Sequence, residues 1–176
     1  MKTSTFRALS ALAFALVWLM HPTSVSAQLG DNALSYSDQD FVAQLYQEVI
    51  VSQKLAGLAV NFGNKGSVRS LATRTTDSIR QIRETVRLLA RKKGVVITDE
   101  LTAQNQDVFD RLSNATGDGF DRTYLDILLQ YLPRIQTRCE NIVATTQDAD
   151  LKALASSLIP TIKTRIGEVE TVKSEL

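Results

Sequence analysis

The apolar residues of this chain recur every three or four positions through four long stretches after residue 37. This period places apolar side chains on one face of an α-helix, whereas no stretch alternates for long enough to suggest a β-strand. The regularity is greatest in residues 67–93, where the positions alternate by four and three as in a heptad seam. Such a seam is the packing pattern of left-handed helical bundles, so the sequence predicts an all-α fold. The seam consists of Val68, Ala72, Thr75, Ile79, Ile82, Val86 and Leu89.

Short connections between long amphipathic helices favour an antiparallel four-helix bundle. The connection between the second and third long helices is longer than the others and contains a short amphipathic segment. We therefore expect a four-helix bundle with a short extra helix in that connection. The expected long helices are 38–62, 67–93, 119–146 and 149–174, and the short helix is 99–113.

Four residues mark expected helix ends. Ser37, Ser67 and Thr98 each offer a side-chain oxygen to the free N–H groups of a first helical turn. Gly94 is expected to stop the second long helix. The expected core face of the first helix comprises Phe41, Leu45, Val49, Ser52, Leu55 or Ala56, Ala59 and Phe62.

The first 27 residues predict an export signal. Lys2 and Arg7 precede an apolar stretch at 8–20, which is shorter than the roughly 20 residues that span a membrane. Val25 and Ala27 fit the −3 and −1 positions of a signal-peptidase site. We therefore expect cleavage after Ala27 and a periplasmic or secreted product without an integral membrane span. The alternative is an uncleaved, loosely anchored N-terminus.

The remaining chain is expected to hold one domain. Residues 28–37 predict a flexible leader, and 38–176 predict a single four-helix-bundle domain.

The composition after residue 27 excludes several chemistries. It contains no His, no Met and no Trp, and Cys139 is its single cysteine. Haem ligation, di-iron bundle sites, zinc sites and histidine-dependent nucleophilic catalysis all need residues that are missing. We therefore expect no enzyme, no metal and no cofactor, although a Ser/Lys dyad or a carboxylate pair stays open. Asp118 to Asp121 and Asp148 to Asp150 leave an oxygen-only calcium site open, but neither matches the 12-residue calcium loop.

Cys139 falls on the apolar stripe of the third long helix, between Ile135 and Ile142. This position favours a buried residue that acts as a small hydrophobe. The alternatives are an intermolecular disulfide or a redox thiol, and both require exposure.

One helix carries a marked charge excess. Residues 67–93 contain eight basic and two acidic residues, and Arg80, Arg83, Arg87 and Arg91 lie about one turn apart on one side. Three interpretations of this basic side stay open. It is a solvated face with local ion pairs, or it faces the acidic connection at 99–126 within the same fold. The third interpretation is a docking surface for a partner. A docking surface would suit an acidic protein or an anionic envelope component. Nucleic acid is not expected, because the exported chain has no overall basic excess.

Several short motifs resemble an exported bacterial family, domain of unknown function 4142, over roughly residues 38–170. The most distinctive is Phe120-Asp121-Arg-Thr-Tyr124, and the resemblance implies a ferritin-like helical bundle. Members of that family typically carry His on the second, third and fourth long helices, where this chain has Ile79, Leu132 and Arg165. The other matching motifs are Asp40-Phe41, Glu48, Leu55-Ala56, Val68 to Ala72, Leu151 to Ala155 and Ile159 to Thr161.

Two functions remain open. The first is a non-enzymatic binding or envelope-associated module that uses the basic face at Arg80 to Arg91. The second is a carrier of a small apolar ligand or a lipid, which would lie in the bundle interior near Pro133 and Pro160, two prolines expected to bend their helices.

Overall fold

The computed structural model describes residues 33–176, and this part of the chain is all-α, with five helices and no strand. The all-α prediction is therefore confirmed. The signal predicted at 1–27 and the first residues of the predicted leader lie outside the described residues. The helices are α1 (Tyr36–Phe62), α2 (Gly66–Lys93), α3 (Ala103–Ser113), α4 (Gly117–Thr145) and α5 (Ala149–Ser174).

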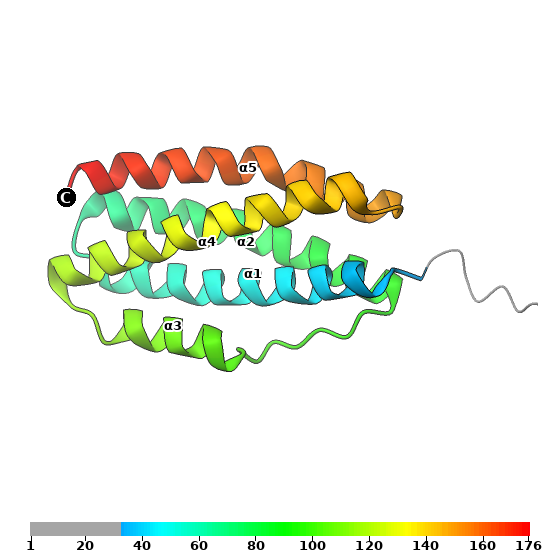
Figure 1. The fold of residues 1–176 in the computed structure, drawn as a ribbon. Helices are drawn as coiled ribbons and strands as arrows, with labels where there is room; N and C mark the ends of the chain where they lie inside the picture. Colours follow the sequence, from blue (N-terminus) through cyan, green and yellow to red (C-terminus); the bar gives the residue numbers. More distant parts are fainter. Residues whose placement is uncertain (1–32) are drawn as a thin grey trace, which may run out of the picture.

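The four long helices lie side by side, and α3 lies outside them against α1 and α4 (Figure 1). The most extensive packing joins α1 to α2 and α4 to α5, which are neighbours in sequence. Smaller contacts of α1 with α4 and of α2 with α5 join these two helical hairpins. The connection between α2 and α3 runs back beside α1, so that α4 starts at the same end of the molecule as α2.

The core fills the space between the two hairpins and reaches from one end of the molecule to the other. One cluster of buried residues surrounds the N-terminal half of α1, and a second surrounds its C-terminal half. The α2 seam is buried as predicted, apart from the partly exposed Ile82. None of the helices in residues 33–176 combines the length and the apolar character that a membrane crossing demands.

The first helix starts two residues earlier than predicted. Its N-cap is Ser35, whose hydroxyl accepts a 3.2 Å hydrogen bond from the N–H of Asp38, so the prediction of Ser37 is wrong. Leu34 is 5% exposed and packs into the core cluster that surrounds the N-terminal half of α1. The end of the predicted leader is therefore packed, because an apolar side chain just before the cap covers the core.

The second helix has no side-chain cap of its own. Ser67 lies inside α2, which starts at Gly66, so the predicted cap is wrong. The buried carboxylate of Asp121 on α4 instead accepts the N–H groups of Asn64 and Lys65, at 2.8 and 2.7 Å. The cap is thus supplied by tertiary packing. Gly94 ends α2 in the left-handed conformation, at φ 70°, as predicted.

The short helix starts four residues later than predicted, with Thr102 as its cap in place of Thr98. The side chain of Gln47 on α1 explains the difference. It donates to the carbonyls of Thr98 and Glu100, both at 2.9 Å, and accepts from the N–H of Thr102. These bonds occupy backbone groups that a longer helix would need.

Two residues of α1 differ from the predicted core face. Phe62 is 65% exposed at the last position of the helix. Tyr46 was not expected in the core, yet it is 1% exposed, and its hydroxyl donates a hydrogen bond to Asp99. Pro133 and Pro160 lie inside α4 and α5, and both helices continue through them.

Candidate functional site

The four predicted arginines lie along α2, but the structure divides them into two pairs. Arg83 and Arg87 turn toward the connection that follows α2 and contact the same carboxylate. Arg83 Nη2 lies 2.9 Å from Asp99 Oδ1, and Arg87 Nη2 lies 3.3 Å from Asp99 Oδ2. The interpretation that the basic helix faces the acidic connection therefore holds for these two residues.

The hydroxyl of Tyr46 joins this group from α1. It donates a 2.6 Å hydrogen bond to Asp99 Oδ1 and accepts one of 3.1 Å from Arg87 Nη2. Arg83 also donates to the side-chain oxygen of Gln53 on α1. Three segments thus meet here, and both guanidinium groups are held in fixed positions on the surface. We call Tyr46, Arg83, Arg87 and Asp99 the arginine cluster.

The charges in the cluster stabilise one another. The hydrogen bond from Tyr46, followed by that from Arg83, lowers the pKa of Asp99 below its ordinary value. The contact with Tyr46, followed by that with Asp99, raises the pKa of Arg83 and of Arg87. All three side chains therefore stay charged at neutral pH.

Arg80 and Arg91 form the second pair, at the two ends of the basic face. Both residues are exposed, and neither has an ion pair or a hydrogen bond from its side chain to another residue in the described part of the chain. The local pairs of Arg80 with Asp77 or Glu84 that a solvated face would show do not form. One carboxylate thus balances two of the four arginines.

A groove of about 430 Å³ lies next to the arginine cluster. Its lining comes from α1, from the C-terminal end of α2 and from the connection that follows. A lining that combines guanidinium groups and apolar side chains suits a ligand that carries both negative charge and apolar groups. The lining residues are Tyr46, Arg87, Arg91, Val95, Val96, Ile97 and Asp99.

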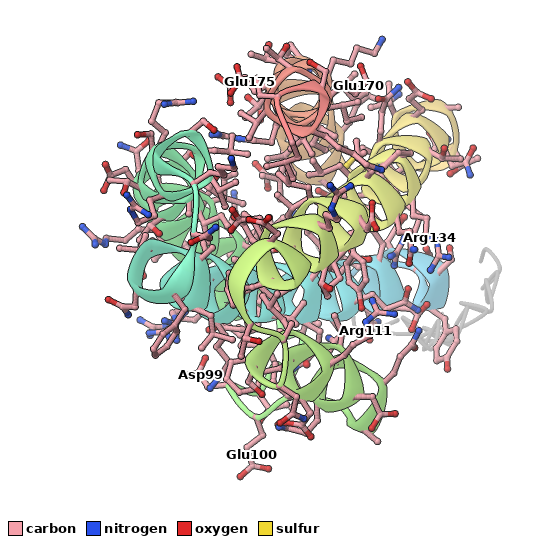
Figure 2. The ribbon with its side chains drawn as sticks, turned by 90° about the vertical axis from the view of Figure 1, so that its left-hand side faces the viewer. Asp99, Glu100, Arg111, Arg134, Glu170 and Glu175 are labelled. Atoms are coloured by element: carbon pink, nitrogen blue, oxygen red, sulfur yellow. The ribbon has the colours of Figure 1, made fainter. Side chains whose placement is uncertain are left out.

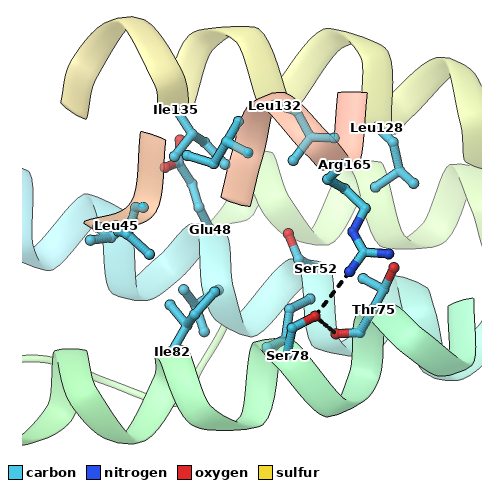
Figure 3. A pocket seen from close by; sticks show the side chains of 14 residues that line it. Leu45, Glu48, Ser52, Thr75, Ser78, Ile82, Leu128, Leu132, Ile135 and Arg165 are labelled. Atoms are coloured by element: carbon cyan, nitrogen blue, oxygen red, sulfur yellow. Dashed lines mark hydrogen bonds between the residues drawn. The ribbon is translucent and has the colours of Figure 1, made fainter. Parts of the chain in front are cut away.

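A second, smaller space lies in the interior between the two hairpins, where the carrier hypothesis placed a ligand (Figure 3). Its volume is about 80 Å³, and its lining is almost wholly apolar. A cavity of roughly 150 Å³ is needed to hold one benzene molecule, so this space is too small for a lipid. Ile79, Leu132 and Arg165, the positions where the resemblance places His, all line it.

The two charged groups at this cavity already have partners. Arg165 donates to Glu168 at 2.7 Å and to the hydroxyl of Ser78 at 3.0 Å (Figure 3). Glu48 forms an ion pair with Arg138, which lies nearer the surface. Each of the two charges thus has a partner, and the surface that faces the space is mainly apolar.

Cys139, on α4, is fully buried in the core, as its position on the apolar stripe predicted. Burial raises the pKa of its thiol to about 11. A buried, protonated thiol is a poor nucleophile, which argues against the redox alternative.

The two aspartate clusters that left calcium open have structural partners. Asp121 caps the turn before α2, and Asp118 accepts a hydrogen bond from the side chain of Asn64 at 2.7 Å. Asp148 caps α5, and Lys93 pairs with both Asp148 and Asp150, at 2.5 and 3.0 Å. Across residues 33–176, no three or more His, Cys, Asp or Glu side chains gather closely enough to hold a metal ion.

Sequence reasoning found the four arginines but missed Tyr46, Gln53 and Asp99 as their partners. Tyr46 follows Leu45 of the predicted stripe and was not part of the predicted core face. Asp99 lies where the short helix was predicted to start, so it was not singled out as a partner of α2. The available signal was a tyrosine next to an apolar stripe, because the ring of such a residue can pack in the core while its hydroxyl makes a polar contact at the core edge.

Comparisons with known proteins support the fold. A family model described as Domain of unknown function (DUF4142) matches residues 23–172. The crystal structure of a DUF305 fragment from Deinococcus radiodurans is similar to this chain, with a TM-score of 0.73 and 16% identity. The match covers 82% of this chain and 99% of the fragment, and at this identity it shows the fold alone. No curated protein matches the chain.

Proposed function

We propose that this chain, which belongs to the family described as Domain of unknown function (DUF4142), is an exported, non-enzymatic binding module that uses the basic face of α2. The ligand class is an acidic protein or an anionic component of the cell envelope. The face consists of Arg80, Arg83, Arg87 and Arg91.

One observation carries this proposal. The guanidinium groups of Arg83 and Arg87 are fixed by Tyr46 and Asp99, while Arg80 and Arg91 beside them have no acidic partner in the described residues. Pre-positioned arginines lose less side-chain freedom when an anion binds, so the binding free energy is more favourable. The surplus of positive charge also attracts an anionic partner at long range.

The fold that carries this face is, we infer, a single ferritin-like domain, an antiparallel four-helix bundle with α3 added to its side. The pairing of α1 with α2 and of α4 with α5, and the similarity to the DUF305 fragment, support this assignment. Export is supported by the sequence pattern that ends at Ala27. A periplasmic or secreted location would expose the face to envelope components.

The carrier alternative rests on the cavity between the hairpins. The cavity lies near the two prolines, as that hypothesis requires, with Leu132 and Ile135 on α4 and Leu158 and Ile162 on α5. Its volume of about 80 Å³ suits a molecule of a few atoms at most. The binding module is therefore the better-supported function.

Crosslinking in living cells tests the proposal, with products identified by mass spectrometry. The wild-type protein is compared with the Arg80→Ala/Arg83→Ala/Arg87→Ala variant. A matched control replaces three exposed cations elsewhere, namely Arg74, Arg134 and Lys152. We expect a discrete partner that the wild type and the control capture and the variant loses. Identical crosslinks in all three proteins would refute the basic face as the binding surface.

The distribution of charge makes the control informative. Figure 2 shows Asp99 on the side of α3 that is nearer α2, and Arg134 on the other side, next to α4. The control removes the same number of positive charges and leaves Arg80, Arg83 and Arg87 in place. Circular dichroism of each variant establishes that the helices remain folded before crosslinks are compared.

A further inference from the structure

We propose that the groove beside Val95, Val96 and Ile97 binds an extended acidic segment of a partner protein, which pairs with the backbone of Val96 and places carboxylates on Arg87 and Arg91. This inference rests on the proposed function and specifies the ligand of the same face. It adds a recognition mode, the addition of a strand to an open backbone edge.

The segment after α2 has the side-chain pattern of an extended chain. Val95 and Ile97 are partly buried and pack against the core, whereas Val96 between them is 89% exposed. This alternation is the one that a β-strand on a core surface shows. No strand partner is present in residues 33–176, so the segment offers a single edge.

The backbone of this segment has open hydrogen-bonding groups. The N–H of Val95 donates to the carbonyl of Ala90, and the carbonyl of Thr98 accepts from Gln47. Between these two bonds, the N–H and C=O groups of Val96 and Ile97 have no partner in the described part of the chain. In an extended chain the backbone groups of neighbouring residues point to opposite edges, and the N–H of Val95 points to α2. A peptide added at the other edge therefore satisfies the groups of Val96 by ladder bonds.

Both ends of the segment are fixed, so the segment loses little conformational entropy when a peptide binds. Gly94 anchors the N-terminal end, where its own N–H and that of Val95 bond to the last turn of α2. Asp99 anchors the C-terminal end through Tyr46 and the arginines. A pre-ordered edge binds an extended peptide at lower entropic cost than a free loop does.

The positive charge of the groove lining favours an acidic segment over a basic one. Asp99 is the one carboxylate in the groove lining, and Tyr46, Arg83 and Arg87 already bond to it. Arg91, also in the lining, has no acidic partner in the described residues, so the groove is positive overall. A basic segment would be repelled.

The shape of the groove favours a peptide over a lipid surface. The groove holds about 430 Å³, within the range of roughly 300–1,000 Å³ that is typical of ligand sites. Its concave lining between α1 and the connection admits a chain, whereas a flat bilayer contacts convex surfaces and needs more protruding apolar side chains. In the groove lining, Val96 is the one strongly exposed apolar residue.

Fluorescence anisotropy with the purified protein tests the inference. The probe is a labelled peptide of alternating Glu and Val, acetylated and amidated at its ends. We expect it to bind, and we expect affinity to fall at least tenfold in Arg87→Gln/Arg91→Gln but not in Arg74→Gln/Arg134→Gln. The same peptide with alternate backbone nitrogens methylated should bind at least tenfold more weakly, because it lacks ladder donors. Hydrogen exchange at the amide of Val96 should slow when the unmodified peptide binds.

The opposite results would overturn the inference. Equal binding of the methylated peptide, or of a Lys and Val peptide, would exclude strand addition or charge selection. Vesicles of phosphatidylglycerol serve as the comparison. If the vesicles bind and the acidic peptide does not, the ligand is a lipid and the strand-addition inference is wrong. The proposed function would still hold if Arg80→Ala/Arg83→Ala/Arg87→Ala bound the vesicles more weakly than the wild type. If neither probe binds, the strand-addition inference fails, and the crosslinking result alone decides the proposed function.

Discussion

Asp121, on α4, accepts a 2.8 Å hydrogen bond from the backbone N–H of Asn64, in the turn between α1 and α2. The second oxygen of the same carboxylate accepts from the next N–H, that of Lys65, at 2.7 Å. Asp121 is fully buried, as are Phe120 and Tyr124 beside it. The Phe-Asp-x-x-Tyr motif is therefore a structural element that locks the first hairpin onto α4.

Replacing Asp121 tests this role. Asp121→Ala removes the charged acceptor of two backbone N–H groups, so we expect the free energy of unfolding to fall by about 3 kcal/mol. Asp118→Ala is the matched control, because Asp118 contacts only the exposed side chain of Asn64 and should cost less than about 1 kcal/mol. Urea denaturation followed by circular dichroism measures both. Equal losses would show that the cap contributes nothing specific.

The arginine cluster predicts a dependence of stability on acid. Tyr46 and Arg83 hold the pKa of Asp99 below its ordinary value of 3.8 in the folded protein. The contribution of a group with a lowered pKa is complete above that ordinary value and disappears as the pH falls through the lowered one. Wild-type stability should therefore fall more steeply below about pH 4 than that of Asp99→Asn. Because Asp99 is half exposed, the difference should be small, within about 1 kcal/mol.

Chemical denaturation at pH 7, 4 and 3 gives the comparison. The result that would contradict the prediction is a constant difference between the two proteins over this range. It would mean that Asp99 contributes through its shape and hydrogen bonds alone.

Cys139 should resist thiol reagents in the folded protein. Its pKa of about 11 keeps the thiol protonated up to about pH 9, and its side chain is buried. We expect negligible reaction with an aromatic disulfide reagent at pH 8, and complete reaction within minutes in denaturant. Rapid reaction of the native protein, or a disulfide-linked dimer on a non-reducing gel, would reverse the assignment of a buried thiol.

Lys93 ties the end of α2 to the start of α5. Its side chain is 2% exposed and bonds to Asp148 and Asp150. Lys93→Met keeps the aliphatic packing but leaves Asp148 without its ion-pair partner, whereas Asp150 keeps Lys92, so we expect a loss of about 2 kcal/mol. Lys92→Met is the control, because Lys92 bonds to Asp150 from a position that is 57% exposed. Its cost should stay below about 1 kcal/mol in thermal or urea denaturation. Similar costs for both variants would show that burial of Lys93 adds nothing.

The sequence predicted the helices well because their determinants are local. The α2 seam, Gly94 at its end and the 149–174 helix follow from apolar period and from backbone conformation, and the structure reproduces them. The caps were predicted less well. Ser67 failed because Asp121, more than 50 residues away, supplies the cap, and no local pattern reports a partner at that distance.

The candidate site shows the same division. The alignment of Arg80 with Arg83, Arg87 and Arg91 follows from helical geometry. Their separation into a fixed pair and an unpaired pair depends on Asp99, which a long connection brings alongside α1. The groove likewise needs the path of residues 94–102, which sequence period alone does not determine.

The pairing of α1 with α2 and of α4 with α5 has a kinetic consequence. Most contacts join residues that are close in sequence, so the chain has a low contact order for its length. Chains of this kind fold in microseconds to milliseconds, because little loop entropy is lost before contacts form. We expect each helical hairpin to form quickly. The slowest step of folding should be the docking of the two hairpins, which are joined by the long connection between α2 and α4.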